Sequence, residues 1–242
     1  MWWRKKGSET MKFQEHVVVL TGAGISAESG LSTFRDQGGL WEQFDIEDVA
    51  TPEAWERNPE MVRRFYNERR RQVRQAEPNR AHHSLVELER RCQVSIITQN
   101  VDNLHERAGS SHVLHLHGDI LQARSVVDPE EVVDLSERDI TPSDTCSHGY
   151  PLRPNVVWFG EAVPAMEQAM HLVARADHLL VVGSSLGVYP AASLVQHTEP
   201  GVPVTVVDPN ARLQLPGARI IRKPATEGVP EWVGRFKATF TI

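Results

Sequence analysis

The chain has 242 residues, of which 40% are hydrophobic and 24% charged, an ordinary balance for a globular protein. Its formal net charge of -6 implies no general affinity for nucleic acid or anionic membranes, and no apolar run approaches the ~20 residues of a membrane span. Only Cys92 and Cys146 are cysteines, so we expect no disulfide framework and a cytoplasmic location. A monomer with no nucleic-acid or membrane partner is expected.

Several short apolar runs have the character of buried parallel strands. They are residues 17–20, 94–98, 113–116, 179–182 and 202–207. Apolar residues at spacings of three and four predict helices over residues 79–91 and 165–176. Strands that alternate with helices predict an α/β fold, a Rossmann-like doubly wound parallel sheet.

Two stretches break this alternation and predict a smaller module formed by two insertions. Residues 35–78 are helical and charged, and residues 119–154 carry acids and prolines. The Rossmann-like domain is therefore expected to comprise residues 11–34, 79–118 and 155–242.

The first apolar run leads into a glycine turn, Gly22-Ala23-Gly24. A strand, such a turn and a following helix can hold a phosphate on free backbone N–H groups. The alternative is a turn that needs glycine only for packing. The acidic residue that usually reads a dinucleotide ribose about 20 residues later has no clear place here.

Five motifs in order resemble the sirtuins, the NAD-dependent protein-lysine deacylases. They are GAGISAESGLSTFRD (22–36), TQNVDNLHERAG (98–109), LHGDI (116–120), NVVWFGE (155–161) and VVGSSLGVYPAA (181–192). The resemblance implies that an acyl group passes from lysine to ADP-ribose and that nicotinamide is released. Its bacterial branch that removes succinyl and acetyl groups is the most similar.

The resemblance also implies residue roles. The residues expected to bind NAD are Gly22, Ala23, Gly24, Ile25, Ser26, Glu28, Phe34, Arg35, Trp41, Gln99, Asn100, Val101, Asp102, Gly183, Ser184, Ser185, Asp208, Pro209, Asn210 and Ala225. Asp208 stands where sirtuins usually carry asparagine.

His117 and Asn100 are the expected catalytic residues, with His117 as the general base. A neutral imidazole can accept a ribose hydroxyl proton near pH 7. His115 competes with His117 on spacing alone. Asp102 is expected to hold the nicotinamide amide, or else to cap the helix that follows it, and Asn100 has a turn role as its alternative.

An acyl pocket is expected around Tyr66 and Arg69, which lie three apart on one helix face. Arginine offers a planar fork to a carboxylate, so this pair favours succinyl and malonyl groups beside acetyl. A solvated basic helix is the alternative, and the neighbouring Arg63, Arg64, Arg70 and Arg71 are expected to point outward. Val156, Phe159 and Val188 are expected to line the lysine stem, and residues 156–161 to run as an edge strand that pairs with substrate.

Most sirtuins hold a structural zinc ion with four cysteines, but Ser125 stands at the first of those positions here. Only Cys146 and His148 remain, with Asp128 as a possible third ligand, and structural zinc needs four. We therefore expect no metal, and a module held by Val126, Val127, Val132, Val133, Leu135 and Ile140 instead.

Two other functions remain open. A sirtuin-like protein can hydrolyse NAD or transfer ADP-ribose, and a protein of another class can bind NAD or acyl-lysine as a sensor without turnover. An NAD oxidoreductase is disfavoured, because no hydride-transfer residues stand out.

Overall fold

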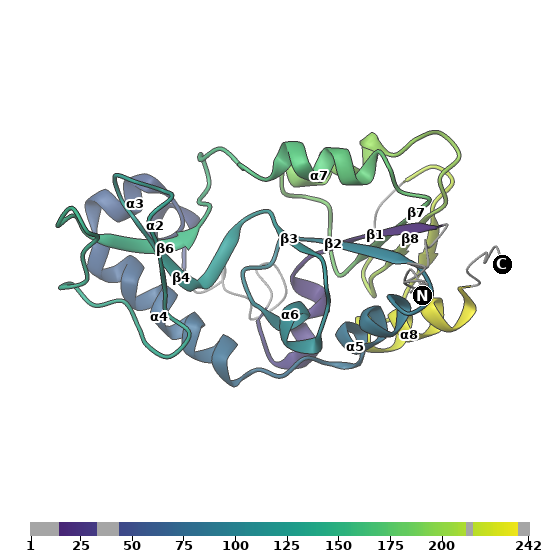
Figure 1. Cartoon of the computed structure of the whole chain (residues 1–242), viewed down its shortest axis with the longest axis horizontal. Coiled ribbons are helices and arrows are strands. Elements are labelled where there is room, and N and C mark those ends of the chain that lie inside the picture. The colour runs from purple at the N-terminus through teal and green to yellow at the C-terminus, as the bar shows by residue number, and fades with distance from the viewer. Residues whose placement is uncertain (1–14, 33–43, 212–214, 237–242) are drawn as a thin grey trace, which may run out of the picture.

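The computed structural model describes residues 15–32, 44–211 and 215–236, and these contain two sheets (Figure 1). The larger sheet is parallel and has six strands in the order β3-β2-β1-β7-β8-β9. The smaller sheet is antiparallel, in the order β5-β4-β6. The strands are β1 His16–Thr21, β2 Gln93–Thr98, β3 Val113–His115, β4 Gly118–Ser125, β5 Val132–Asp134, β6 Leu152–Val156, β7 His178–Val182, β8 Val204–Val207 and β9 Arg219–Ile221.

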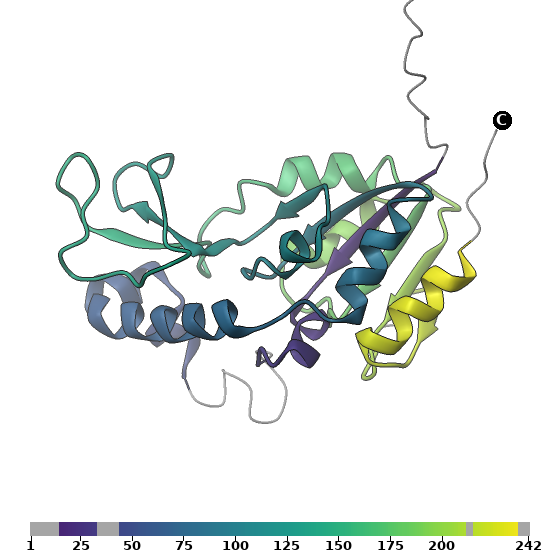
Figure 2. The same ribbon diagram turned by 60° about the horizontal axis from the view of Figure 1, so that its bottom comes forward.

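Helices cover both faces of the larger sheet (Figures 1 and 2). The helical elements are η1 Ala23–Ile25, η2 Ala27–Ser29, α2 Ile46–Val49, α3 Pro52–Arg57, α4 Pro59–Gln75, α5 Arg80–Leu88, α6 Leu104–Ala108, α7 Met166–Val173, η3 Ala191–His197 and α8 Ala225–Arg235. None of the helices in the described ranges is long and apolar enough to cross a membrane.

Burial on both faces explains why the strand sequences are continuous apolar runs. Along β1, Val17 and Val19 pack with α5 and α8, whereas Val18 and Leu20 pack with α7 and η3. All four side chains are fully buried. The predicted doubly wound α/β fold is therefore confirmed.

The order of strands reverses between β1 and β7, which are hydrogen-bonded neighbours at the centre of the sheet. Loops leaving the carboxyl ends of strands at such a switch diverge and leave a crevice that binds ligands in open α/β sheets. The two glycine turns of the sequence follow these two strands.

The predicted elements are found with shifted ends. Helix α5 begins after Asn79, whose side-chain oxygen accepts the N–H of Ala81 at 2.9 Å, and it ends at Leu88. The glycine turn leads into two short 3-10 turns, η1 and η2, where a regular helix was expected. Strands β4, β5 and β9 were not predicted, because polar residues interrupt or shorten their apolar runs.

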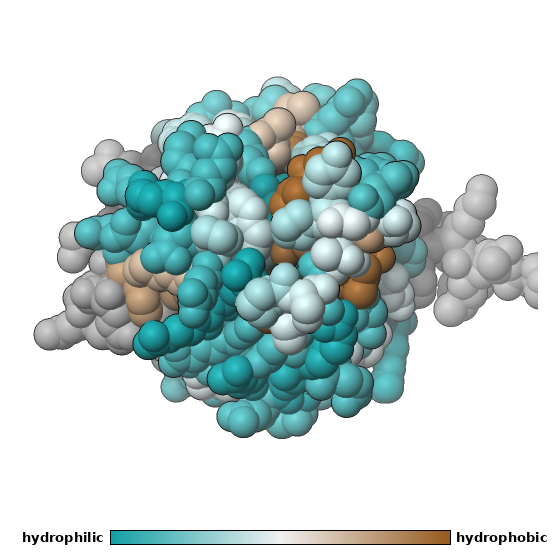
Figure 3. Space-filling model, turned by 90° about the vertical axis from the view of Figure 1, so that its left-hand side faces the viewer, coloured by the Kyte–Doolittle hydropathy of each residue, from teal (hydrophilic) through white to brown (hydrophobic). Residues whose placement is uncertain are grey.

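The small module packs α2, α3 and α4 against one side of the small sheet (Figure 2). On its other side lies a second small core, formed by Ala123, Leu135, Ile140, Cys146 and Leu152, with Val133 packed against it. The expectation that Val126, Val127 and Val132 hold this module is wrong, because all three are exposed. Figure 3 looks onto this end of the molecule, where hydrophilic surface predominates and apolar patches are scattered.

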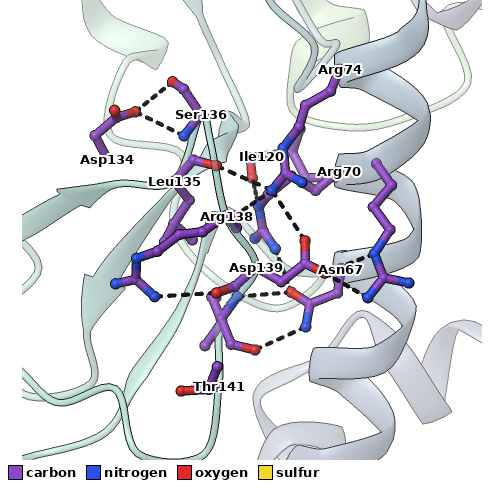
Figure 4. A network of polar contacts seen from close by, with 12 residues as sticks. Asn67, Arg70, Arg74, Ile120, Asp134, Leu135, Ser136, Arg138, Asp139 and Thr141 are labelled. Atoms are coloured by element: carbon purple, nitrogen blue, oxygen red, sulfur yellow. Dashed lines mark hydrogen bonds and ion pairs between the residues drawn. The ribbon is translucent and has the colours of Figure 1, made fainter.

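A polar network joins α4 to the chain between β5 and β6 (Figure 4). Arg70 donates to the carbonyl of Ile120 at 2.7 Å and to Asn67, and Arg74 donates to the carbonyl of Leu135 at 3.2 Å. The prediction that Arg70 points outward is wrong, because its side chain is fully buried. Asn67 is a local neighbour on the same helix, whereas the Ile120 carbonyl of β4 is 50 residues away and only the tertiary structure reveals it.

Candidate active site

A cavity of about 840 Å³ lies where the carboxyl ends of β1, β7 and β8 face the small module. The glycine turns after β1 and β7 form one end, and α4 with the segment after β6 forms the other. Most of the residues predicted to bind NAD or substrate line it. Exceptions among the described ones are Ile25, Ser26 and Asp102, which lie behind its wall. Phe34, Arg35 and Trp41 lie outside the described residues.

The glycine turns contact each other directly. Gly24 donates its N–H to the carbonyl of Gly183 at 2.9 Å, and a Cβ atom on Gly24 would stand only 2.6 Å from the Gly183 Cα. Gly183 also has φ of +57°, where side chains are disfavoured. Packing alone thus requires glycine here, as the alternative interpretation held. The same turns also line the cavity, so the backbone can approach a ligand closely.

Behind the first turn, Ser26 joins the two polar residues that follow β2. Asn100 donates to the Ser26 hydroxyl at 3.1 Å, and that hydroxyl donates to Asp102 Oδ2 at 3.0 Å. Asn100 and Asp102 therefore point the same way, as their alternation predicted. Asp102 Oδ1 also accepts the N–H of Leu104 at 3.1 Å, although the N-cap position of α6 is Asn103, so Asp102 supports the start of the helix from one residue before the cap. Burial raises the pKa of Asp102, although these two hydrogen bonds oppose the shift.

His117 lines the cavity, and a backbone carbonyl determines which of its two ring nitrogens carries the hydrogen. Its Nδ1 lies 2.9 Å from the carbonyl oxygen of Gln99, which can only accept, so Nδ1 carries the hydrogen. Burial lowers the pKa of His117, despite this hydrogen bond. A neutral ring with a lone pair on Nε2 is the form that a general base requires.

His115 lies in different surroundings from His117. Its Nε2 lies 2.7 Å from Glu106, its Nδ1 lies 3.1 Å from the carbonyl of Asn100, and it does not line the cavity. Burial alone would lower the pKa of His115, but the Glu106 carboxylate raises it overall. A ring that favours its charged form and is held on both nitrogens is a poor base, so the geometry favours His117.

The end of the cavity that the glycine turns form is also lined by Ser184, Ser185, Asp208, Pro209, Asn210 and Ala225. Gln99 donates to the Ser184 hydroxyl at 3.0 Å and so ties the ends of β2 and β7 together. Asp208 accepts the N–H of Asn210 at 2.7 Å. Glu28 accepts from the backbone and hydroxyl of Thr226, which joins the first turn to α8.

The other end of the cavity is lined by Tyr66, Arg69, Val156, Phe159 and Val188, as predicted. Tyr66 and Arg69 are 5% and 9% exposed, so a solvated basic helix does not describe them. Burial lowers the pKa of the Arg69 guanidinium. Phe65 and Trp158 also line this wall, although the sequence analysis did not assign them to it. Each directly precedes a predicted residue, Tyr66 or Phe159, but only the fold shows which way its side chain faces.

The segment expected to pair with substrate is a strand only in part. Strand β6 is an edge strand, but it ends at Val156. Phe159 lies in the turn that follows, and its N–H donates to the carbonyl of Ala50 at 3.0 Å. The prediction of a strand through residue 161 is wrong, because the carboxylate of Glu161 accepts the Trp158 N–H and turns the chain.

In the region where most sirtuins hold zinc, Cys146 and His148 lie close to Glu131. Sequence reasoning named Asp128 as the third ligand, whereas Glu131 is the acid that belongs to this cluster. Glu131 already accepts from the backbone and hydroxyl of Ser147, and the Ser125 hydroxyl bonds the Cys146 thiol. These donors differ from the four thiolates or imidazoles of a structural zinc site.

Comparisons with known proteins agree with this geometry. A model of the Sir2 family matches residues 22–190. The chain is 48% identical over 224 residues to an NAD-dependent protein deacylase of Bacteroides thetaiotaomicron, covering 90% of this chain and 96% of the relative. It is 52% identical over 198 residues to an NAD-dependent protein deacylase of Helicobacter pylori (strain 26695), covering 82% and 86%.

Among solved structures, a mutant Sir2 homologue in complex with ADP-ribose has a TM-score of 0.84 and 41% sequence identity, with 90% of each chain covered. Both the sequence and the arrangement of elements are thus shared over nearly the whole chain. The chain belongs to the Sir2 family.

Proposed function

We propose that this chain is an NAD-dependent protein-lysine deacylase, which transfers an acyl group from lysine to ADP-ribose and releases nicotinamide. The observation that carries the proposal is one cavity that combines a neutral His117, two glycine turns and a buried Tyr66–Arg69 pair. Its relatives at about half sequence identity are named NAD-dependent protein deacylases.

The residues present fit NAD. A Cβ atom at Gly22 would stand 2.8 Å from the Gly183 carbonyl oxygen, so the turns leave bare backbone at the crevice where a pyrophosphate binds in related folds. Asn100 and Val101 line the cavity and would hold the nicotinamide side, with Asp102 directly behind them, and Gly183, Ser184 and Asp208 would lie on the adenosine side. When bound, NAD supplies the nicotinamide–ribose bond whose cleavage makes the ribose carbon electrophilic.

The chain's own groups have distinct tasks. The Nε2 atom of His117 accepts a hydroxyl proton, and the Gln99 carbonyl keeps the ring in the required tautomer. The Ser26–Asn100–Asp102 network orients the polar groups beside it. Apolar walls from Phe65, Val156 and Val188 keep bulk water from the reacting centre, which matters because water would compete for the activated sugar.

The acyl range is expected to include succinyl and malonyl groups beside acetyl. Support comes from Tyr66 and Arg69, which face the cavity from one side of α4 and are nearly buried. A buried cation in an apolar wall gains from meeting a carboxylate, because both charges have left water. We also propose a monomer in the cytoplasm, where the free Cys92 and Cys146 stay reduced, and no bound zinc.

The test is incubation of the protein and NAD with matched peptides that carry acetyl-, malonyl- or succinyl-lysine, followed by mass spectrometry. We expect free lysine peptide, nicotinamide and O-acyl-ADP-ribose in equal amounts. NAD consumption without peptide would instead indicate an NAD hydrolase or ADP-ribosyltransferase. Binding without any product would indicate a sensor.

A further inference from the structure

The Tyr66 hydroxyl receives a hydrogen bond from the indole of Trp158, with Nε1 and Oη 3.0 Å apart. An indole N–H can only donate, so the tyrosine oxygen must be the acceptor. The hydroxyl hydrogen is then left for another partner. No described residue accepts it, and Tyr66 lines the cavity beside Arg69.

This hydroxyl stays protonated at neutral pH. Burial raises the pKa of Tyr66 to about 12, although the Trp158 hydrogen bond opposes the shift. Tyr66 therefore offers a hydrogen to an incoming group and cannot act as an anion there. A carboxylate, which has only acceptor oxygens, matches that hydrogen, and a methyl group does not.

The indole that sets this direction is itself held on several sides. The guanidinium of Arg153 lies 3.3 Å from the Trp158 ring centroid, and Trp55 packs against the same ring at 5.9 Å between centroids. Glu161 accepts from Arg153 through both oxygens, at 2.6 and 2.9 Å, and from the Trp158 backbone N–H at 2.7 Å.

Glu161 is also a cavity residue, and its charge would repel an acidic acyl group if it were alone. Arg153 and Arg124 both pair with it, at 2.6 and 3.3 Å. The charge of Glu161 is thus balanced within the wall. Its carboxylate serves to fix Arg153 and Trp158.

We propose that Trp158 determines specificity, by holding the Tyr66 hydroxyl as a hydrogen-bond donor toward the carboxylate of an acidic acyl chain. Trp158 acts through Tyr66 and is a positioning residue. The inference rests on the proposed deacylase function and deepens it. It predicts that loss of one N–H group weakens succinyl recognition more than acetyl recognition.

The test is a double-mutant cycle with Trp158→Phe, Tyr66→Phe and both together, assayed on matched succinyl- and acetyl-lysine peptides. Phenylalanine keeps an aromatic ring between Arg153 and Trp55 but has no N–H. Hydrogen bonds to charged groups are worth enough that we expect the succinyl KM to rise by about ten-fold in each single variant. The acetyl kcat/KM should fall by much less, so that the ratio of succinyl to acetyl kcat/KM drops by about ten-fold. The double variant should be no worse than Tyr66→Phe alone.

Several results would overturn the proposal. One is an equal loss on both peptides in Trp158→Phe, which would make Trp158 structural, and another is losses that add in the double variant. A third is an unchanged succinyl KM.

If Trp158→Phe does not fold, replacing Trp158 with benzothienylalanine, which exchanges only the N–H for sulfur, gives the same comparison. A parent protein inactive on both peptides would instead overturn the deacylase proposal, and one active only on acetyl-lysine would overturn the acidic-acyl range together with this inference.

Discussion

At His117 the direction of one hydrogen bond decides what the side chain can do. The Gln99 carbonyl takes the Nδ1 hydrogen, and burial lowers the pKa, so the ring presents a neutral Nε2. His115, two residues earlier, is held by Glu106 and the Asn100 carbonyl. The sequence spacing left both histidines as candidates, whereas their environments separate them.

We expect His117→Ala to reduce deacylation by about 10²- to 10⁴-fold, the usual contribution of a general base. NAD binding, measured by calorimetry, should be largely kept, since the proposed role is proton transfer. His115→Asn is the matched comparison and should lose much less. Activity of His117→Ala within a few-fold of the parent would move the role of base to His115.

Asp102 has a structural task beside its proposed ligand contact, because its two oxygens accept from Leu104 and Ser26. Asp102→Asn places an amide hydrogen against one of these donors. We expect a drop in the free energy of unfolding of about 1–3 kcal/mol, together with weaker nicotinamide inhibition. Urea unfolding and inhibition assays separate the two effects. Unchanged inhibition in a folded variant would leave Asp102 with the structural role alone.

Helix α4 shows how one element serves two purposes. It starts with Asn58 as its cap and Pro59 in its first turn, and its apolar side packs into the small module. Tyr66 and Arg69 face the cavity, Arg70 binds the Ile120 carbonyl of β4, and Arg74 binds the segment between β5 and β6. The run of arginines in the sequence is therefore divided among cavity, core and solvent.

Arg69→Met should lower succinyl and malonyl turnover by about ten- to a hundred-fold and leave acetyl turnover nearly unchanged. Methionine keeps an apolar stem but removes the carboxylate-binding fork. Arg64→Met is the matched control, since Arg64 is exposed on the same helix. An equal loss on all three acyl groups would show that Arg69 is structural, and no loss would remove the acidic-acyl proposal.

Cys146 is the one cysteine in the region where most sirtuins hold zinc, and apolar side chains pack around it. Leu135, Ile140 and Leu152 are buried around Cys146. We expect purified protein to contain far less than one zinc per chain by elemental analysis, and chelator treatment to leave its melting temperature unchanged. One zinc per chain that resists dialysis would contradict this, and Glu131→Gln would then show whether Glu131 is a ligand.

Across the whole molecule, stability should depend on pH through two buried histidines that the mechanism does not use. His82 and His105 are fully buried, with ring centroids 4.9 Å apart between α5 and α6. Burial lowers the pKa of His82 from 6.5 to about 4, and burial also lowers that of His105 well below 6.5. The folded protein therefore binds fewer protons than the unfolded chain over this range.

Stability should be full above pH 6.5 and fall as the pH drops toward 4, because the unfolded chain then gains protons that the folded chain refuses. The His82 shift alone corresponds to about 3 kcal/mol at the acid end. Urea unfolding at pH 7.5, 6 and 5 measures this slope. His82→Gln should flatten it, whereas the exposed His83→Gln should not. A slope that is unchanged in His82→Gln would assign the acid sensitivity elsewhere.

The sequence by itself determined the α/β class, the central strands and the glycine turns, because buried parallel strands and tight turns leave local patterns of apolar runs and glycine. Five ordered motifs also identified the family. The domain boundaries drawn from it stay a prediction.

Only the tertiary structure decided matters that depend on residues far apart in the chain. It distinguished His117 from His115 through Gln99 and Glu106, and it buried Arg70 against the Ile120 carbonyl. It ended β6 at Val156 and brought Trp158 to the Tyr66 hydroxyl, 92 residues away. Local sequence encodes propensity and periodicity, whereas the partner that satisfies a buried polar group is chosen by the packing of distant elements.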